Sequence, residues 1–158
     1  MLKPTYELNH IFDITPRFLA EIGVKGLILD IDNTMTTHDN PTAAEGVSEW
    51  LTLMNSHKIK MIILSNNTPE RVRPFARVLK LRFVSKGRKP LSSGFKRAIA
   101  KLKLPKSQIC AVGDQIFTDI LGANLAGVKS ILVHPFEAEK TLFFKFKRFM
   151  EKPFRGVK

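Results

Sequence analysis

The chain has 158 residues with 44% hydrophobic content, so we expect a single domain over residues 1–158 with a core of its own. Its one cysteine, Cys110, excludes an internal disulfide framework, and no apolar stretch approaches the roughly 20 residues of a membrane-spanning helix. Lys and Arg number 26 against 14 acidic residues, and the formal net charge of +12 favours anionic partners such as nucleic acid, an anionic lipid surface or a highly phosphorylated substrate.

Strands alternate with helices along the chain. Thr15-Pro16 is typical of a helix start and Gly23 of a helix end. In chain order, the pattern then predicts a strand over 25–31, a helix over 41–56, a strand over 60–64, a helix after Thr68-Pro69 to about 80, a strand over 82–84, a helix capped by Ser92 or Ser93 to about 102, a strand over 109–112, a helix over about 118–126 and a strand over 130–133.

Repeated strand-helix-strand units predict an α/β fold of the Rossmann-like, doubly wound type, with a mostly parallel sheet and helices on both faces. In such sheets the ligand lies at the carboxyl ends of the strands, where the strand order switches. The residues that follow the predicted strands are almost all small polar or charged groups: Asp30, Asp32, Asn33, Thr34, Ser65, Asn66, Lys89, Asp114 and Asp119. We therefore expect one site on that edge.

These side chains are suited to phosphate and metal chemistry. Asp30, Asp32 and Asp114 crowd negative charge that needs a hard cation, and oxygen ligands suit Mg²⁺. One of the two leading carboxylates can attack phosphorus, and the other can protonate the leaving alcohol and later deprotonate water. Ser65 can hold phosphoryl oxygens, and Lys89 can neutralise charge on the nucleophile and the transferring group. Singly each signal is weak, because each string also occurs in ordinary turns, caps and loops.

Four segments together resemble the motifs of the haloacid dehalogenase (HAD) superfamily. They are Asp30-Ile-Asp-Asn-Thr34, Ser65, Lys89-Pro90 and Gly113-Asp-Gln-Ile-Phe-Thr-Asp119. The resemblance implies that Asp30 is the nucleophile and a metal ligand, and that Asp32 is the acid/base, with its carbonyl on Mg²⁺. It also implies that Ser65 binds phosphate, that Lys89 stabilises charge, that Asp114 ligates Mg²⁺ and that Asp119 supports the metal site. We expect Thr34, Asn66 and Lys89 to bind the substrate together with Ser65.

A finer resemblance is to the YqeG family of small phosphatases, which is akin to the phosphatidylglycerophosphate phosphatases. It rests on residues 6–16, 26–34 and 112–119 and on the basic, aromatic-rich tail over about 136–158. Met35 and His134 are mild departures. The short spacing from Thr34 to Ser65 and from Ser65 to Lys89 leaves no room for an inserted cap domain, so we expect an open site.

The tail is expected to form a helix, with four aromatics beside a basic flank that includes Lys145, Lys147 and Arg148. Such a helix either packs on the sheet or lies in a membrane interface. The resulting hypothesis is a Mg²⁺-dependent phosphatase, cytoplasmic and peripheral on the inner face of a membrane, that converts phosphatidylglycerophosphate to phosphatidylglycerol. Two alternatives remain: a phosphatase of nucleic-acid ends or other soluble phosphomonoesters, and a basic nucleic-acid-binding module.

Overall fold

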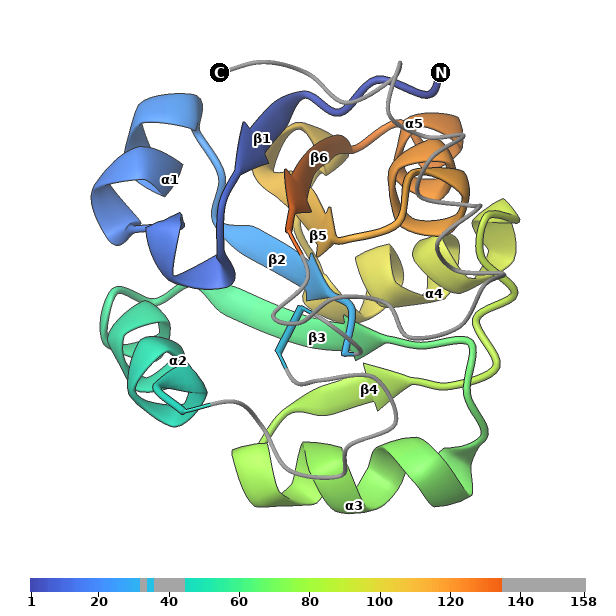
Figure 1. Ribbon diagram of the computed structural model, residues 1–158, viewed down its shortest axis with the longest axis horizontal. Helices are drawn as coiled ribbons and strands as arrows, with labels where there is room; N and C mark the ends of the chain where they lie inside the picture. The colour runs from blue at the N-terminus through green and yellow to red at the C-terminus, as the bar shows by residue number, and fades with distance from the viewer. Residues whose placement is uncertain (32–33, 36–44, 135–158) are drawn as a thin grey trace.

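The computed structural model describes residues 1–31, 34–35 and 45–134, which form a six-stranded sheet (Figure 1). The strands lie in the order β1-β6-β5-β2-β3-β4, and every neighbouring pair is parallel. Their bounds are Tyr6–Leu8 for β1, Gly26–Leu29 for β2, Lys60–Leu64 for β3, Arg82–Val84 for β4, Ile109–Gly113 for β5 and Lys129–Val133 for β6. The predicted doubly wound α/β class is confirmed.

Helices cover both faces of the sheet (Figure 1). On one face lie α1 (Pro16–Ile22), α2 (Val47–Ser56) and α3 (Pro69–Leu79), and on the other lie α4 (Ser92–Leu102) and α5 (Leu121–Ala126). Short 3₁₀ segments occupy η1 (Ile11–Asp13) and η2 (Lys106–Gln108), and a π-helical segment, η3 (Ile116–Ile120), leads into α5. The strand order reverses between β2 and β5, so the switch point lies beside the end of β2.

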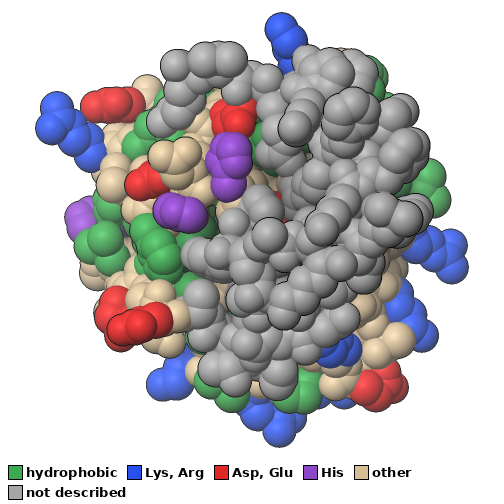
Figure 2. All heavy atoms as spheres, viewed as in Figure 1, with side chains coloured by type: hydrophobic (Ala, Val, Ile, Leu, Met, Phe, Trp, Pro, Cys, Tyr) green, Lys and Arg blue, Asp and Glu red, His purple; other side chains and the backbone are tan. Residues whose placement is uncertain are grey.

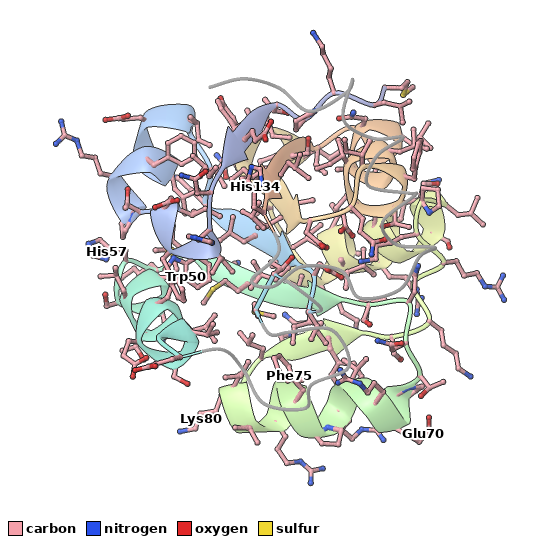
Figure 3. All side chains as sticks on the ribbon, viewed as in Figure 1. Trp50, His57, Glu70, Phe75, Lys80 and His134 are labelled. Atoms are coloured by element: carbon pink, nitrogen blue, oxygen red, sulfur yellow. The ribbon has the colours of Figure 1, made fainter. Side chains whose placement is uncertain are left out.

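The central strand explains why the apolar run was continuous rather than alternating. All four residues of β2 are buried, with Leu27 and Leu29 in the core on the α1–α3 face and Ile28 in the core on the α4–α5 face. On the first face the indole Nε1 of Trp50 donates a 2.8 Å hydrogen bond to the carbonyl of Ile14, which ties α2 to the chain before α1 (Figure 3). A strand buried on both faces holds the residue that follows it, the expected nucleophile, in a fixed place.

Several element ends agree with the sequence signals. The Thr15 hydroxyl accepts from the Phe18 amide at the start of α1, and Gly23 ends that helix in the left-handed conformation at φ 73°. The helix predicted over 41–56 begins only at Val47, because Gly46 is left-handed at φ 89°; residues 41–44 lie outside the described part. Ser92 is the first helical residue of α4 rather than its cap.

Strand β1 was not predicted from the sequence. It is only three residues long and is held beside β6 by parallel pairing and by two hydrogen bonds between Thr5 and Ser130. The expected tail helix over 136–158 lies outside the described residues. Within the residues described, no helix has the length and apolar content needed to cross a bilayer.

Candidate active site

The carboxyl ends of three neighbouring strands bring the expected side chains together. Asp30 follows β2, Ser65 follows β3 and Asp114 follows β5. Together with Asn66, Asn67, Gln115 and Thr118, the residues Asp30, Ser65, Lys89 and Asp119 line a cavity of about 120 Å³. This cavity has room for a small group such as a phosphoryl group beside Asp30.

Lys89 links the nucleophile position to the far wall of the site. Its Nζ donates to Asp30 Oδ1 at 2.9 Å, to Asp119 Oδ1 at 2.8 Å and to the carbonyl of Leu64 at 3.1 Å. A lysine ammonium has three N–H donors, and these three bonds use all of them. The Lys89 side chain is 5% exposed, so its charge acts on Asp30 with little screening by water. Lys89 therefore fixes the orientation of the Asp30 carboxylate.

The charge state of Lys89 follows from two opposing effects. Burial lowers its pKa, but the carboxylates of Asp119 and Asp30 outweigh burial, and the net result is a pKa well above the ordinary lysine value. The ammonium is accordingly protonated throughout the neutral range, and the favourable interaction is fully present there. It is lost only as the pH rises above the ordinary lysine value.

The position of Asp119 depends on a glycine and on the π-helical segment. A Cβ added to Gly113 would lie 2.3 Å from Asp119 Cγ, so only glycine at the end of β5 allows this carboxylate to lie over the strand. Asp119 Oδ2 accepts from the Gln115 amide at 3.2 Å, while Oδ1 accepts from Lys89. Both oxygens thus already accept hydrogen bonds. The geometry makes Asp119 a positioning residue for Lys89, and its prediction as a metal ligand stays a prediction.

The loop after β3 supports the site through backbone contacts. Asn66 accepts from the Lys89 amide at 2.7 Å and donates to the Lys89 carbonyl at 3.2 Å, so both ends of its side chain hold the Lys89 backbone. The Ser65 hydroxyl accepts from the Asn67 amide at 3.1 Å and keeps its own proton to donate. Asn66 therefore positions the Lys89 backbone, and the predicted substrate contacts of Ser65 and Asn66 stay predictions.

Of the expected groups on the first loop, Thr34 is the one that the structure describes beyond Asp30. It is fully buried, and its hydroxyl lies 3.5 Å from Asp30 Oδ2, a long contact beside the carboxylate; its role as a substrate contact stays a prediction. Asp32 and Asn33 lie outside the described residues. The acid/base role of Asp32 therefore rests on the sequence.

Three carboxylates at this edge form a group that suits a cation. One oxygen from each of Asp30, Asp114 and Asp119 lies within 4.8 Å of the others, and Asp114 is fully buried. With Lys89 as the ammonium in their midst, three ionised carboxylates keep an excess of two negative charges. Buried excess charge is costly unless it is neutralised, and carboxylate oxygens are the donors that Mg²⁺ takes. The donor set therefore fits a hard divalent cation.

Comparison with known proteins agrees with this arrangement. The family model of haloacid dehalogenase-like hydrolases matches residues 19–127. A relative from Bacillus subtilis (strain 168), named probable phosphatase YqeG, is 40% identical over 149 residues, which cover 94% of this chain and 87% of the relative. The chain belongs to the haloacid dehalogenase-like hydrolases. The predicted family and the predicted enzyme class, a phosphatase of the haloacid dehalogenase type, are thereby confirmed.

Solved structures of other proteins share the fold at low sequence identity. A haloacid dehalogenase-like hydrolase from Brucella suis 1330 has a TM-score of 0.63 at 10% identity, covering 79% of this chain and 88% of its own. An uncharacterised protein from Listeria monocytogenes serotype 4b has a TM-score of 0.60 at 19% identity, covering 75% and 85%. The cobalt-bound deoxy-D-mannose-octulosonate 8-phosphate phosphatase (YrbI) from Haemophilus influenzae has a TM-score of 0.59 at 16% identity, covering 79% and 75%.

Sequence reasoning missed the supporting contacts of the site. It did not foresee that Asn66 holds the Lys89 backbone, that Gln115 binds Asp119, or that Gly113 is needed for close approach. The only sequence signal for these roles was the adjacency of each residue to a motif residue.

Proposed function

We propose that this enzyme hydrolyses phosphomonoesters through an aspartyl-phosphate on Asp30, with Mg²⁺ as cofactor and phosphatidylglycerophosphate as substrate. The observation that carries the reaction type is the 2.9 Å bond from Lys89 Nζ to Asp30 Oδ1, at the end of a strand buried on both faces. A carboxylate held in this way meets an incoming phosphoryl group in one orientation, and such pre-orientation lowers the entropic part of the activation barrier.

Asp30 and Asp114 are the residues that would hold Mg²⁺, with the Asp32 carbonyl implied by the family resemblance. When bound, the ion supplies neutralisation of charge on the phosphoryl oxygens. The remaining groups act without it. The Ser65 hydroxyl donates to a phosphoryl oxygen, and Lys89 keeps Asp30 oriented and offsets the negative charge that the phosphoryl group brings.

The chemistry then runs in two steps. In the first, an oxygen of Asp30 forms a bond to phosphorus as the bond from phosphorus to the alcohol oxygen breaks. Asp32 donates a proton to the alcohol oxygen, which leaves as the free alcohol. In the second, water attacks the phosphorus of the aspartyl-phosphate, Asp32 takes a proton from the water, and the Asp30 carboxylate and inorganic phosphate are released.

The choice of substrate is supported by the shape of the site and by the tail sequence. Only α3 and β4 separate Ser65 from Lys89, so no cap domain is inserted there. The 120 Å³ cavity beside Asp30 has room for a phosphoryl group. A site with no cap inserted between Ser65 and Lys89 suits a phosphate presented on a larger surface, and the tail sequence contains Lys145, Lys147 and Arg148 beside aromatic residues. A headgroup on an anionic bilayer meets both features.

The first experiment tests the reaction type with Asp30→Asn. Turnover and phosphoenzyme formation should disappear while the circular dichroism spectrum and the thermal midpoint are kept or the midpoint rises, since one of three crowded carboxylates is neutralised. Substantial activity in this variant would disprove the aspartyl-phosphate mechanism.

The second experiment tests the substrate. Phosphate release is measured from vesicles containing phosphatidylglycerophosphate, from nucleotides and sugar phosphates, and from 5′-phosphorylated DNA ends, with and without reversal of charge at Lys145, Lys147 and Arg148. We expect the vesicle substrate to be preferred, and the triple reversal to reduce that activity alone and to abolish salt-sensitive sedimentation with anionic vesicles. Unchanged vesicle turnover in the triple variant, or preference for DNA ends, would refute the lipid substrate.

A further inference from the structure

The edge of the sheet opposite the active site carries a row of basic residues. The amino ends of all the strands meet at this edge, where β3 begins with Lys60, β4 with Arg82 and β6 with Lys129. Lys25 directly precedes β2, and Lys106 begins the 3₁₀ segment before β5. These five strands are neighbours in the order β4-β3-β2-β5-β6. At about 4.8 Å per strand, the row is roughly 19 Å long.

Part of this row is hollowed. A groove of about 560 Å³ lies where β3 and β4 begin and where α2, α3 and α4 end, and it is more than four times the 120 Å³ of the active-site cavity. No acidic residue is among the described residues that line it. Its six basic lining residues, which define what we call the amino-edge groove, are Lys58, Lys60, Lys80, Arg82, Lys101 and Lys103.

Three of these lysines occupy backbone positions that disfavour a side chain. Lys58, Lys80 and Lys103 have φ values of 60°, 58° and 55°, each just after the last turn of its helix. The equivalent positions after α1 and α5 hold Gly23 and Gly127. A left-handed residue other than glycine lowers the folding equilibrium constant by roughly fivefold or more. Lysine at all three positions around one groove therefore works against stability.

Stabilisation of the helix ends does not explain these three lysines. A basic residue near a helix C-terminus gains roughly twofold to fivefold in the folding equilibrium, and α3 and α4 already have Arg77 and Lys101 in their last turns. Lys60 Nζ donates to the Leu102 carbonyl at 3.2 Å, and Arg82 donates to the Lys101 carbonyl at 2.8 Å, so the end of α4 is capped from the neighbouring strands. The three left-handed lysines add charge that the fold does not require.

The groove and the active site face opposite ways. Figure 3 shows Lys80 at the end of α3 nearer to α2, and Glu70 at the other end of α3, toward the carboxyl edge of the sheet. Around the rim of the face in Figure 2, basic side chains project into solvent. A bilayer placed against the groove would turn the active site away from the lipid. The groove thus calls for a partner other than the membrane that presents the proposed substrate.

We propose that the amino-edge groove and the row of basic residues beside it bind the phosphate backbone of a nucleic acid. Lysine binds phosphate as a point charge, and one strand of a duplex places a phosphate about every 3.4 Å along its axis, so a 19 Å row spans roughly five or six of them. No aromatic side chain is among the described residues that line the groove, so bases have no stacking surface. Binding is therefore to the backbone and independent of base sequence.

The test replaces the three left-handed lysines with the residue that their backbone prefers. The triple variant Lys58→Gly, Lys80→Gly, Lys103→Gly should be at least as stable as the wild type, so loss of binding cannot be ascribed to unfolding. Binding of a fluorescein-labelled duplex DNA is followed by anisotropy between about 50 and 200 mM salt. We expect the slope of log K against log salt to become less steep by about 2.7, and the affinity near 100 mM salt to fall at least about tenfold.

The matched control removes three positive charges elsewhere, with Arg17→Gln, Arg73→Gln and Lys96→Gln on exposed helical positions. This variant should keep the wild-type salt slope within about one unit, and both triple variants should keep their turnover of a soluble aryl phosphate. If both triple variants lost the same amount of duplex-DNA affinity, the loss would be due to net charge alone, and the proposal would be overturned. Absence of duplex binding in the wild type, or a glycine variant that loses binding to phosphatidylglycerol vesicles instead of duplex DNA, would also overturn it.

Discussion

Replacing Lys89 by methionine tests the central ion cluster without changing the bulk of the side chain greatly. The substitution leaves Asp30, Asp114 and Asp119, with oxygens within 4.8 Å of one another, without the ammonium, and it removes the donor to the Leu64 carbonyl. Breaking a buried ion pair by removing one partner costs about 3–5 kcal/mol. For a chain of this size the thermal midpoint should fall by roughly 6–20 °C.

The pH and the Mg²⁺ concentration should each change the loss of stability in Lys89→Met in a direction that follows from the structure. The pKa of Lys89 is raised in the folded protein, so its contribution is complete below the ordinary lysine value of 10.5 and is lost as the pH rises above it. The difference in unfolding free energy between wild type and variant should therefore stay constant from about pH 7 to 10 and then shrink. Added Mg²⁺ should raise the midpoint of the variant more than that of the wild type, because the uncompensated carboxylates bind the ion more tightly.

Urea unfolding followed by tryptophan fluorescence and circular dichroism measures these free energies, with chelator or with Mg²⁺ present. Lys86→Met is the matched control, since Lys86 lies on the same loop and is exposed, and it should change stability by less than about 0.5 kcal/mol. Equal stability of Lys89→Met and Lys86→Met in chelator would show that the buried ion cluster does not stabilise the fold.

Other substitutions probe other parts of the molecule. Gly113→Ala would bring a Cβ to 2.3 Å from Asp119 Cγ, and the displaced carboxylate should cost about a hundredfold in kcat, measured with a soluble phosphomonoester. Asp114→Asn should raise the Mg²⁺ concentration for half-maximal activity by at least about tenfold, measured by titration into chelated enzyme. Trp50→Phe leaves a buried carbonyl without its donor and should cost about 1–3 kcal/mol with activity kept, measured by urea unfolding and turnover. Asp32→Asn should slow alkyl phosphates far more than activated aryl phosphates, measured as single-turnover rates, because only the alkyl leaving group needs a proton.

The sequence was sufficient for the parts of the fold that long apolar runs and strong end signals determine. The apolar run over 25–31 predicted a strand buried on both faces, which the structure shows as the shorter Gly26–Leu29, and the pair Gly23 and Gly127 predicted two helix ends. It was insufficient where stability comes from long-range pairing. Three-residue β1 has no periodicity to detect and exists because it pairs with β6, from the other end of the described chain.

For the site, the sequence predicted which side chains lie close together but not which hydrogen bonds they form. Strand-end placement was enough to group Asp30, Ser65, Lys89 and Asp114. Strand-end placement contains no information on hydrogen-bond partners, so it did not predict that both ends of the Asn66 side chain bind the Lys89 backbone. Contacts of this kind depend on the relative height of two loops, which only the folded chain defines.

The π-helical segment at Ile116–Ile120 has a consequence for insertions and deletions. Its hydrogen bonds run from the Ile120 amide to the Gln115 carbonyl and from the Leu121 amide to the Ile116 carbonyl, so it contains one residue more than an α-helical turn would. Loss of a single residue from this segment would let α5 begin earlier as a regular helix, with its core contacts intact. Asp119 is separated from α5 by Ile120 alone, so loss of Ile120 would move Asp119 one position along the helix, about 100° around its axis and away from Lys89. Because Ile120 is itself a buried core residue, that deletion would lower stability as well as remove the carboxylate from the site.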